Sequence, residues 1–221
     1  ISMRHMDKVL EVDATSQAAR IQGGIYGPAI EDALRDTPFT MRHYMQAYRC
    51  STLGGWIATR SGGHYATLYT HIDDFVESTR VVTPAGTLES RRLPGSGAGP
   101  SPDRLFIGSE GILGIITEAW VRLRKKPTFR ASASVRFKDF YTGADAVRDI
   151  TQAGLYPANC RLLEAREALP GIPWSSKEAV LVLAFESPDH PLDAWMARAL
   201  EICRDHGGVA DVGGDDENAH R

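Results

Sequence analysis

Apolar and polar side chains alternate with a period of two over Phe75–Thr83 and Ala131–Phe137, which is the pattern of half-buried strands. Before Pro127, further short segments bounded by turn residues predict strands over Val9–Asp13, Ala18–Gln22, Thr87–Ser90 and Gly114–Leu123. The turn residues Pro84-Ala85-Gly86 join two of these strands into a predicted hairpin. Apolar spacing typical of helices predicts short helical segments from Pro28 to about Arg35, over Ser51–Arg60 and over Asp103–Phe106.

The pattern changes after Pro127. Strands are predicted over Ala131–Phe137, Asn159–Glu164 and Ala179–Phe185, and amphipathic helices over Gly143–Ala153 and Pro191–Arg204. This order predicts an α+β sandwich whose helices cover one face of a sheet. We therefore expect two domains, residues 1–127 and 128–221. The Gly- and Pro-rich stretch Leu93–Pro102 is predicted to be a surface loop, and Gly207–Arg221 to be a mobile tail.

Composition and charge argue against two classes of protein, nucleic-acid-binding proteins and membrane-spanning proteins. The 221 residues include 25 Lys and Arg and 28 Asp and Glu, a formal net charge of −3, and 43% hydrophobic residues. This balance argues against a nucleic-acid partner held by a basic surface. The longest apolar run, Ala179–Phe185, has seven residues, whereas a membrane-spanning helix needs about 20. The segment Ile1–Leu10 has no signal-peptide core and no initiator Met, so we expect a fragment of a longer chain.

Three cysteines, Cys50, Cys160 and Cys203, lie far apart and form no CxxC pair. This count argues against a disulfide framework or a zinc site and favours a reducing, cytoplasmic compartment. The stretch from His64 to Asp74 contains two His and two Asp, but their spacing supplies no obvious pair of metal ligands. No metal is therefore predicted, and these histidines are expected to be structural.

Two glycine-rich segments are candidates for ligand binding. Ser51–Gly63 holds four glycines and four hydroxyl residues in thirteen positions, so its backbone can approach a ligand closely. It matches neither the GxGxxG fingerprint nor the phosphate-binding P-loop. Gly108–Glu118 is a glycine-rich turn that leads into an apolar strand, and it can present backbone groups to a planar heterocycle. Taken alone, each segment is equally well explained by a tight turn under a core helix or by a β-bulge.

Four ordered motifs carry a family resemblance: Ser51–Arg60, Tyr69–Asp74, Val81–Gly86 and Gly108–Ala119. Together they resemble the FAD-binding half of the vanillyl-alcohol oxidase/p-cresol methylhydroxylase (PCMH) flavoprotein superfamily, over roughly Val9 to Glu164. Within it the chain is most similar to the alkyldihydroxyacetonephosphate synthase branch and its bacterial FAD-linked oxidase relatives. Arg60, where glycolate-oxidase relatives usually have Asn, and Trp56, which they lack, favour this branch. The implied fold is a PCMH-type FAD-binding subdomain followed by the start of a ferredoxin-like substrate domain.

The resemblance also implies a cofactor, FAD, and a set of residues around it. Arg161 matches an Arg that projects from the substrate-domain sheet toward the flavin, where it can hold an acidic substrate or stabilise negative charge on the reduced ring; a surface strand residue is the alternative. The implied cofactor-binding residues are Gln46, Ser51, Thr52, Gly54, Gly55, Thr59, Arg60, Ser61, Gly62, Glu110, Gly111, Gly114, Ile115 and Ile116.

The expected activity is flavin chemistry on a small-molecule substrate at the interface of the FAD and substrate domains. In the synthase branch a fatty alcohol replaces an acyl group, and the alternative is an FAD-dependent hydroxy-acid or alcohol oxidase or dehydrogenase. A third alternative is a truncated, non-catalytic relative. Its support is that the family's first pyrophosphate loop and catalytic tail lie outside this sequence, and that Met45 and Arg49 depart from the family pattern, as does Thr70 in place of a common Gly. A homodimer is possible, and no membrane segment or nucleic-acid partner is expected.

Overall fold

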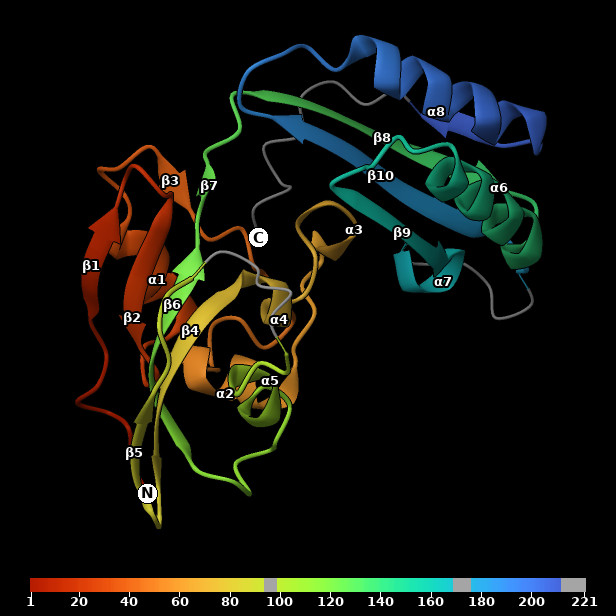
Figure 1. Cartoon of the computed structure of the whole chain (residues 1–221). Helices are drawn as coiled ribbons and strands as arrows, with labels where there is room; N and C mark the ends of the chain where they lie inside the picture. Colours follow the sequence, from red (N-terminus) through yellow and green to blue (C-terminus); the bar gives the residue numbers. More distant parts are fainter. Residues whose placement is uncertain (94–98, 169–175, 212–221) are drawn as a thin grey trace. The chain divides into compact units, whose positions relative to one another are not determined.

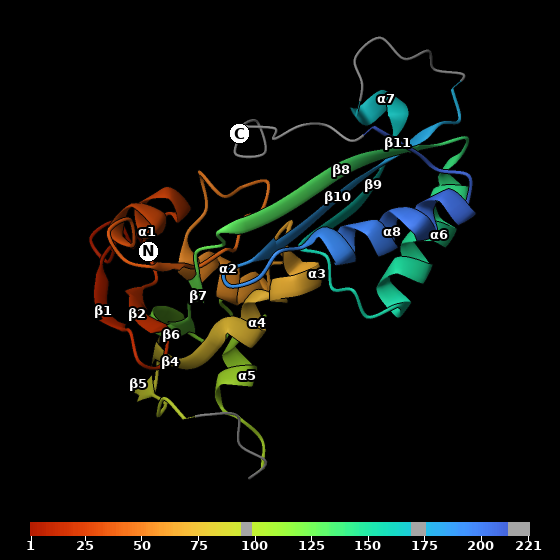
Figure 2. The same ribbon diagram turned by 90° about the horizontal axis from the view of Figure 1, so that it is seen from above.

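The computed structural model describes residues 1–93, 99–168 and 176–211. The chain divides into two compact units, Ile1–Lys126 and Pro127–Arg221. Most elements of both units are labelled in Figure 1, and β11 is labelled in Figure 2. Each unit has its own sheet and its own buried core, so each is described by itself.

The first unit is built on a five-stranded antiparallel sheet with the order β1-β2-β6-β4-β5 (Figure 1). The strands are β1 (Val9–Asp13), β2 (Ala18–Gln22), β4 (Val76–Thr83), β5 (Gly86–Glu89) and β6 (Ile115–Arg122). A separate short pair joins β3 (Phe39–Thr40) to β7 (Arg124–Lys125). Strand β6 comes from far along the sequence and lies between the two hairpins, so it ties them into one sheet.

The first unit also contains the short helices α1 (Gly27–Ala33), α2 (Leu53–Thr59), α3 (Ala66–Tyr69), α4 (Ile72–Phe75) and α5 (Asp103–Phe106). Helices α2, α4 and α5 contact strands of the sheet. Leu53 and Ile57 of α2 are fully buried, as are Ile21 of β2 and Val121 of β6. The burial of these aliphatic side chains is the main force that holds α2 on the sheet.

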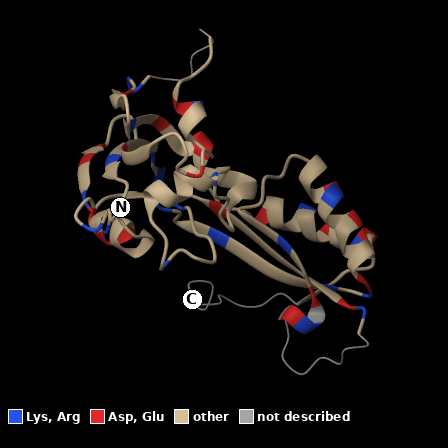
Figure 3. Ribbon diagram, turned by 90° about the horizontal axis from the view of Figure 1, so that it is seen from below, with Lys and Arg blue, Asp and Glu red and all other residues tan. Residues whose placement is uncertain are grey.

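The opposite face of the sheet carries charged side chains from alternate positions of the strands. Glu118 of β6 is nearly buried and accepts hydrogen bonds from Arg20 at 2.7 Å and from Arg80 at 3.2 Å. Arg80 also forms an ion pair with Glu89 at 3.5 Å. Figure 3 shows basic and acidic residues interspersed along the ribbon rather than gathered by sign. The charges of this face therefore neutralise one another across four strands.

The second unit has the ferredoxin-like arrangement, with two βαβ halves and a four-stranded antiparallel sheet in the order β11-β8-β10-β9. Its strands are β8 (Phe129–Phe137), β9 (Asn159–Glu164), β10 (Ala179–Ser187) and β11 (Val209–Asp211). Its helices are α6 (Phe140–Gln152), α7 (Ala165–Ala168) and α8 (Asp193–Asp205). Helices α6 and α8 run side by side over one face of the sheet (Figure 2). The predicted α+β fold with helices on one sheet face is confirmed.

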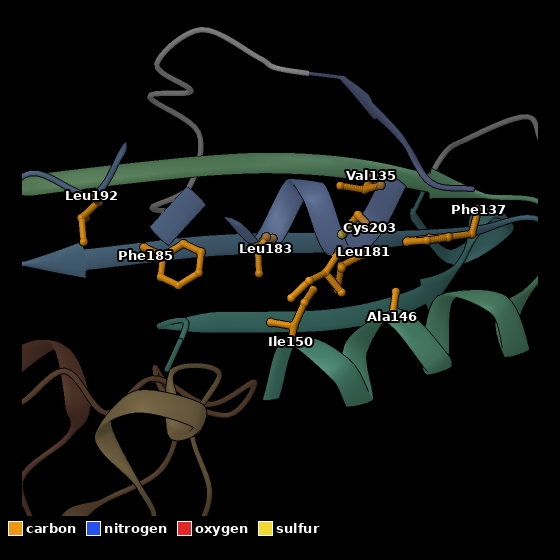
Figure 4. Packing of buried hydrophobic residues seen from close by; sticks show 11 residues of the cluster. Val135, Phe137, Ala146, Ile150, Leu181, Leu183, Phe185, Leu192 and Cys203 are labelled. Atoms are coloured by element: carbon orange, nitrogen blue, oxygen red, sulfur yellow. The ribbon is translucent and has the colours of Figure 1, made fainter. Parts of the chain in front are cut away.

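The core of the second unit lies between this sheet and the two long helices. Leu181 and Leu183 of β10 are fully buried, and Ile150 of α6 and Cys203 of α8 pack against them (Figure 4). Cys203 is thus a small buried hydrophobe, and burial raises the pKa of its thiol to about 11. A thiol in this state is a poor nucleophile at neutral pH.

Several predicted boundaries were wrong, and for three of them the structure shows the reason. Helix α6 begins three residues before the predicted Gly143, because Asp139 caps it. Phe75, predicted to begin a strand, instead ends α4 and is buried. Residues 209–211 of the predicted tail form β11 because they pair with β8. The rest of that tail and residues 94–98 of the predicted loop lie outside the described residues.

The cap of α6 leads to a stability prediction. The carboxylate of Asp139 accepts hydrogen bonds from the backbone N–H of Thr142 at 2.8 Å and from its hydroxyl at 2.9 Å. These bonds lower the pKa of Asp139. Replacing a capping Asp by Ala leaves helix N–H groups without a partner, so Asp139→Ala should lower the unfolding midpoint by about 4 °C.

Differential scanning calorimetry measures this change. Asp145→Ala is the control, since Asp145 lies on the exposed face of the same helix and forms only an exposed ion pair with Arg148. An equal shift in both variants would mean that the Asp139 cap contributes nothing of its own.

Candidate functional site

The first glycine-rich segment forms helix α2 and the turns at its two ends. Thr52 is the extended residue before the helix, and Arg60 ends it in the left-handed conformation, with φ 54°. The Ser51 hydroxyl accepts a hydrogen bond from the indole N–H of Trp56 and donates one to the Ala47 carbonyl, both at 2.7 Å. Thr59 donates to the Gly55 carbonyl at 3.0 Å. The Ser51 hydroxyl thus links the buried Trp56 of α2 to the loop that precedes the helix.

The second glycine-rich segment, residues 108–114, lies directly against the end of α2. The backbone N–H of Gly108 donates to the Ile57 carbonyl at 3.0 Å, and that of Glu110 donates to the Ala58 carbonyl at 3.0 Å. The two segments are about fifty residues apart in sequence and were predicted separately. The fold therefore places the turn of residues 108–114 beside the end of α2, where the predicted residues Thr59 and Arg60 lie.

Two of the predicted glycines are explained by packing. A Cβ atom on Gly54 would lie 2.9 Å from the Gly23 carbonyl oxygen, and one on Gly114 would lie 2.8 Å from the Val82 carbonyl oxygen. The absence of a side chain at Gly54 and Gly114 lets helix and strands approach closely. A Cβ on Gly62 would lie 3.4 Å from the His71 ring, which is ordinary contact.

Gly55 and Gly111 are different. A Cβ on Gly55 would meet only the Thr52 hydroxyl, at 3.5 Å, and one on Gly111 would meet nothing within 4 Å. Both residues are exposed, and Gly111 has φ +81°, which favours glycine. Packing inside the unit therefore leaves the space beside each of these two residues open.

Apolar side chains are exposed in the turn of residues 108–114. Ile112 is 83% exposed and Leu113 is 43% exposed, and both follow Gly111 directly. On the neighbouring helix α5, Leu105 is 66% exposed. A group of exposed aliphatic side chains beside an open glycine backbone is typical of a ligand-binding surface. In contrast, Ile116, which was also predicted to contact the cofactor, is buried at the start of β6.

A buried histidine that the sequence analysis did not single out lies next to this surface. His43 is 2% exposed, its Nε2 is 2.9 Å from the Ser61 hydroxyl oxygen, and its ring packs against Trp56 and Phe75. Burial, and secondarily the charge of His71, lowers the pKa of His43 to about 4, so its imidazole is neutral at pH 7. The only sequence signal for it was the unusual density of aromatic residues between Thr40 and Cys50.

Backbone strain gathers around the candidate site. Arg60, Thr70 and Glu110 adopt positive φ values of 54°, 68° and 53°. Such conformations are unfavourable for residues with side chains and often occur at functional sites. Two of the three, Arg60 and Glu110, are predicted cofactor residues, and each lies where the two glycine-rich segments meet.

Two predicted residues belong to other segments of the chain. Gln46 is exposed in the loop that precedes α2. Arg161 belongs to the second unit, where it is half-buried on β9 and forms an ion pair with Glu167 at 3.2 Å. Its neighbours Cys160 and Leu162 pack against the helix-covered core, so Arg161 projects from the other face of the sheet.

Within the described residues, His, Cys, Asp and Glu form no group of three that could hold a metal ion. No helix in that part of the chain has both the length and the apolar character needed to cross a membrane.

Comparisons with known proteins match both units. Residues 1–90 match the family model described as "FAD binding domain", and residues 126–221 match the one described as "FAD linked oxidases, C-terminal domain". The chain belongs to the FAD-linked oxidase family. FAD is the cofactor that both descriptions name, which agrees with the resemblance of the four sequence motifs.

The individual relatives of the chain include synthases and oxidases. An alkyldihydroxyacetonephosphate synthase from Dictyostelium discoideum is 39% identical over 181 residues, which are 81% of this chain and 30% of the relative. Glycolate oxidase subunit GlcD from Bacillus subtilis is 30% identical over 210 residues, 91% of this chain and 44% of the relative. A solved alkyldihydroxyacetonephosphate synthase structure superposes with a TM-score of 0.84 at 30% identity, covering 95% of this chain and 42% of that one.

The chain thus spans about 30% to 44% of the length of these relatives. The surface formed by residues 51–62 and 108–114 fits an FAD group. FAD is an elongated molecule with planar apolar rings and polar linkers, so it needs both close backbone approach and apolar walls. Gly55 and Gly111 offer open backbone, and Ile112 and Leu113 offer exposed apolar side chains.

Proposed function

We propose that this protein is an FAD-dependent enzyme of the alkyldihydroxyacetonephosphate synthase type, which replaces the acyl group of acyl-dihydroxyacetonephosphate with a fatty alcohol. The observation that carries the proposal is the 39% identity to the Dictyostelium discoideum synthase, together with Arg60 and Trp56 in the first glycine-rich segment. Bound FAD supplies the chemistry at its flavin ring. The residues of this chain bind and orient the reacting groups.

In this proposal the cofactor is held mainly by backbone groups of the first unit. Gly55 and Gly111 lie where the backbone is open, and Ile112 and Leu113 provide an apolar wall. The full proposed set is Gln46, Ser51, Thr52, Gly54, Gly55, Thr59, Arg60, Ser61, Gly62, Glu110, Gly111, Gly114, Ile115 and Ile116. Among these, Gly54, Gly114 and Ile116 also have packing roles, so their substitution would disturb the fold as well as the cofactor.

A hydroxy-acid or alcohol oxidase is the second candidate. It is supported by the match to glycolate oxidase subunit GlcD, which extends over more of this chain than the match to the synthase. Both candidates share the cofactor and differ in the electron balance, because an oxidase reduces its flavin and the acyl exchange is redox-neutral overall. Fold alone does not choose between them.

A visible absorbance spectrum of the purified protein, recorded before and after substrate addition, separates the candidates. The synthase proposal expects a flavin spectrum that persists with hydroxy acids and alcohols but changes with acyl-dihydroxyacetonephosphate. Bleaching by a hydroxy acid would instead favour the oxidase. If no flavin is retained after incubation with FAD, both candidates fail and a non-catalytic role takes their place.

Arg161 provides a second test. We propose that its guanidinium holds an acidic group of the substrate. Arg161→Ala should therefore lower turnover by about 10- to 100-fold, the loss expected for one hydrogen bond to a charged group, and leave the flavin content unchanged. The control is Arg148→Ala, which removes an exposed arginine of α6 in the same unit. Equal turnover in the two variants would make Arg161 an ordinary strand residue.

A further inference from the structure

Arg60 connects the two glycine-rich segments through its side chain. A Cβ atom placed on Gly108 would lie 2.8 Å from Cδ and 2.9 Å from Cγ of Arg60, so the arginine stem lies directly across Gly108. The side chain of a bulkier residue at position 108 would occupy this space. The Arg60 stem therefore covers the beginning of the turn formed by residues 108–114.

The guanidinium end of Arg60 is held by Asp73. The two groups are 3.5 Å apart, and Asp73 also accepts a hydrogen bond from Arg104 of α5 at 2.9 Å. Asp73 is 19% exposed at its side chain, whereas Arg60 is 53% exposed. The arginine thus reaches from the end of α2, over Gly108, to a carboxylate on α4 that is largely shielded from water.

Backbone hydrogen bonds join the segments at the same place. The N–H groups of Gly108 and Glu110 donate to the carbonyls of Ile57 and Ala58. These two bonds fix the position of the turn relative to α2, and the Arg60 side chain lies over the first of them. Arg60 itself adopts a left-handed conformation that is unfavourable for a residue with a long side chain.

We infer that Arg60 is a positioning residue, which clamps the turn of residues 108–114 onto the end of α2 through Gly108 and Asp73. This inference rests on the proposed function and changes the role of Arg60 within it, from a direct cofactor contact to a residue that acts through the turn. A flexible turn would have to be ordered when FAD binds, and a turn that is already ordered avoids this cost. The clamp thus preorganises the backbone around Gly111.

Hydrogen exchange on the flavin-free protein tests the clamp without relying on activity. Arg60→Gln and Asp73→Asn should each speed exchange at the Gly108 and Glu110 amides by about tenfold, because local opening of the turn becomes more frequent. Arg35→Gln is the control, since it removes an exposed arginine that pairs with Asp32 on α1. Unchanged exchange in both test variants would overturn the inference.

FAD titration followed by flavin fluorescence separates a clamp from a direct contact. For a clamp, R60Q and D73N each weaken FAD binding by about fivefold, and the double variant is no weaker than either single one. For a direct contact, D73N leaves the affinity unchanged or raises it, because the freed guanidinium still reaches the cofactor. That result, with unchanged exchange, would overturn the clamp.

The two failures remain distinguishable. If the unaltered protein binds no FAD, the proposed function fails, whereas faster exchange in R60Q and D73N still supports a clamp in the flavin-free protein. If the unaltered protein binds FAD and both variants match it in affinity and in exchange, the clamp fails and the proposed function stands.

Discussion

Replacing Gly54 by Val should destabilise the protein by about 3 kcal/mol, whereas replacing the adjacent Gly55 should leave stability almost unchanged and abolish flavin retention. The two glycines occupy neighbouring positions in α2 but face different surroundings. A side chain on Gly54 would collide with the backbone carbonyls of Gly23 and Ile116 at 2.9 and 3.2 Å, where neither strand can move freely. The N–H of Gly54 also donates to the Gly23 carbonyl at 2.8 Å, a bond that this collision would break.

Gly55 has open space on the same helix. Its Cβ atom would meet only the Thr52 hydroxyl at 3.5 Å, which is ordinary contact. Because Val is a slightly better helix residue than Gly, Gly55→Val should keep or slightly raise the free energy of unfolding. The new side chain would occupy the space that the proposed cofactor needs beside the backbone.

Guanidinium unfolding and the ratio of flavin to protein absorbance measure both effects in the same samples. The expected result is loss of stability in Gly54→Val and loss of flavin in a folded Gly55→Val. Flavin content at the normal level in Gly55→Val would remove Gly55 from the proposed site. Normal stability in Gly54→Val would contradict the close packing of α2 on β2 and β6.

The second large effect is on the pH dependence of stability. His43 has a pKa of about 4 in the folded protein, mainly because burial disfavours its charged form, and the ordinary value in the unfolded chain is near 6.5. Between these two values the unfolded chain binds a proton that the folded protein does not. Stability therefore falls as the pH falls from 6.5 toward 4, by about 3 kcal/mol in total from this residue.

Unfolding curves at pH 7.0, 5.5 and 4.5 check this expectation. His43→Gln should be less stable than the unaltered protein at pH 7.0, since Gln packs less well against Trp56 and Phe75. The variant should nevertheless lose less stability between pH 7.0 and 4.5. His5→Gln serves as the control because His5 is exposed. An identical pH dependence in all three proteins would mean that the pKa of His43 is the same in the folded and the unfolded protein, which would contradict the expectation.

Much of the fold follows from local patterns. The sequence predicted β2 (Ala18–Gln22) and β9 (Asn159–Glu164) with their observed bounds, because short segments that contain apolar residues and are bounded by turns are typical of strands. The four motifs predicted the family, which the comparisons confirm. The boundary errors arose where a contact distant in sequence decides the conformation. Residues 209–211 form a strand only because β8 offers an unpaired edge.

The candidate site was predicted only in part, for the same reason. The resemblance named both glycine-rich segments, but the sequence contains nothing that separates Gly54 from Gly55, since a glycine has the same local freedom in either role. His43 was missed because a single histidine carries no signal until its burial beside Trp56 and Phe75 is known. The assignments of individual residues to cofactor contacts remain proposals.

By itself, the amino-acid sequence determined the order of the elements, the α+β class and the flavoprotein family, because these depend on periodicity and on ordered motifs that are local in the chain. Only the tertiary structure decided which glycines face a neighbouring backbone, which histidine has a lowered pKa, and which residues the Arg60 side chain contacts. These properties depend on distances between residues that are far apart in sequence. One example is the 3.0 Å between the backbone nitrogen of Gly108 and the carbonyl oxygen of Ile57. Burial and electrostatic interactions depend on such tertiary contacts, so the local sequence pattern does not predict them.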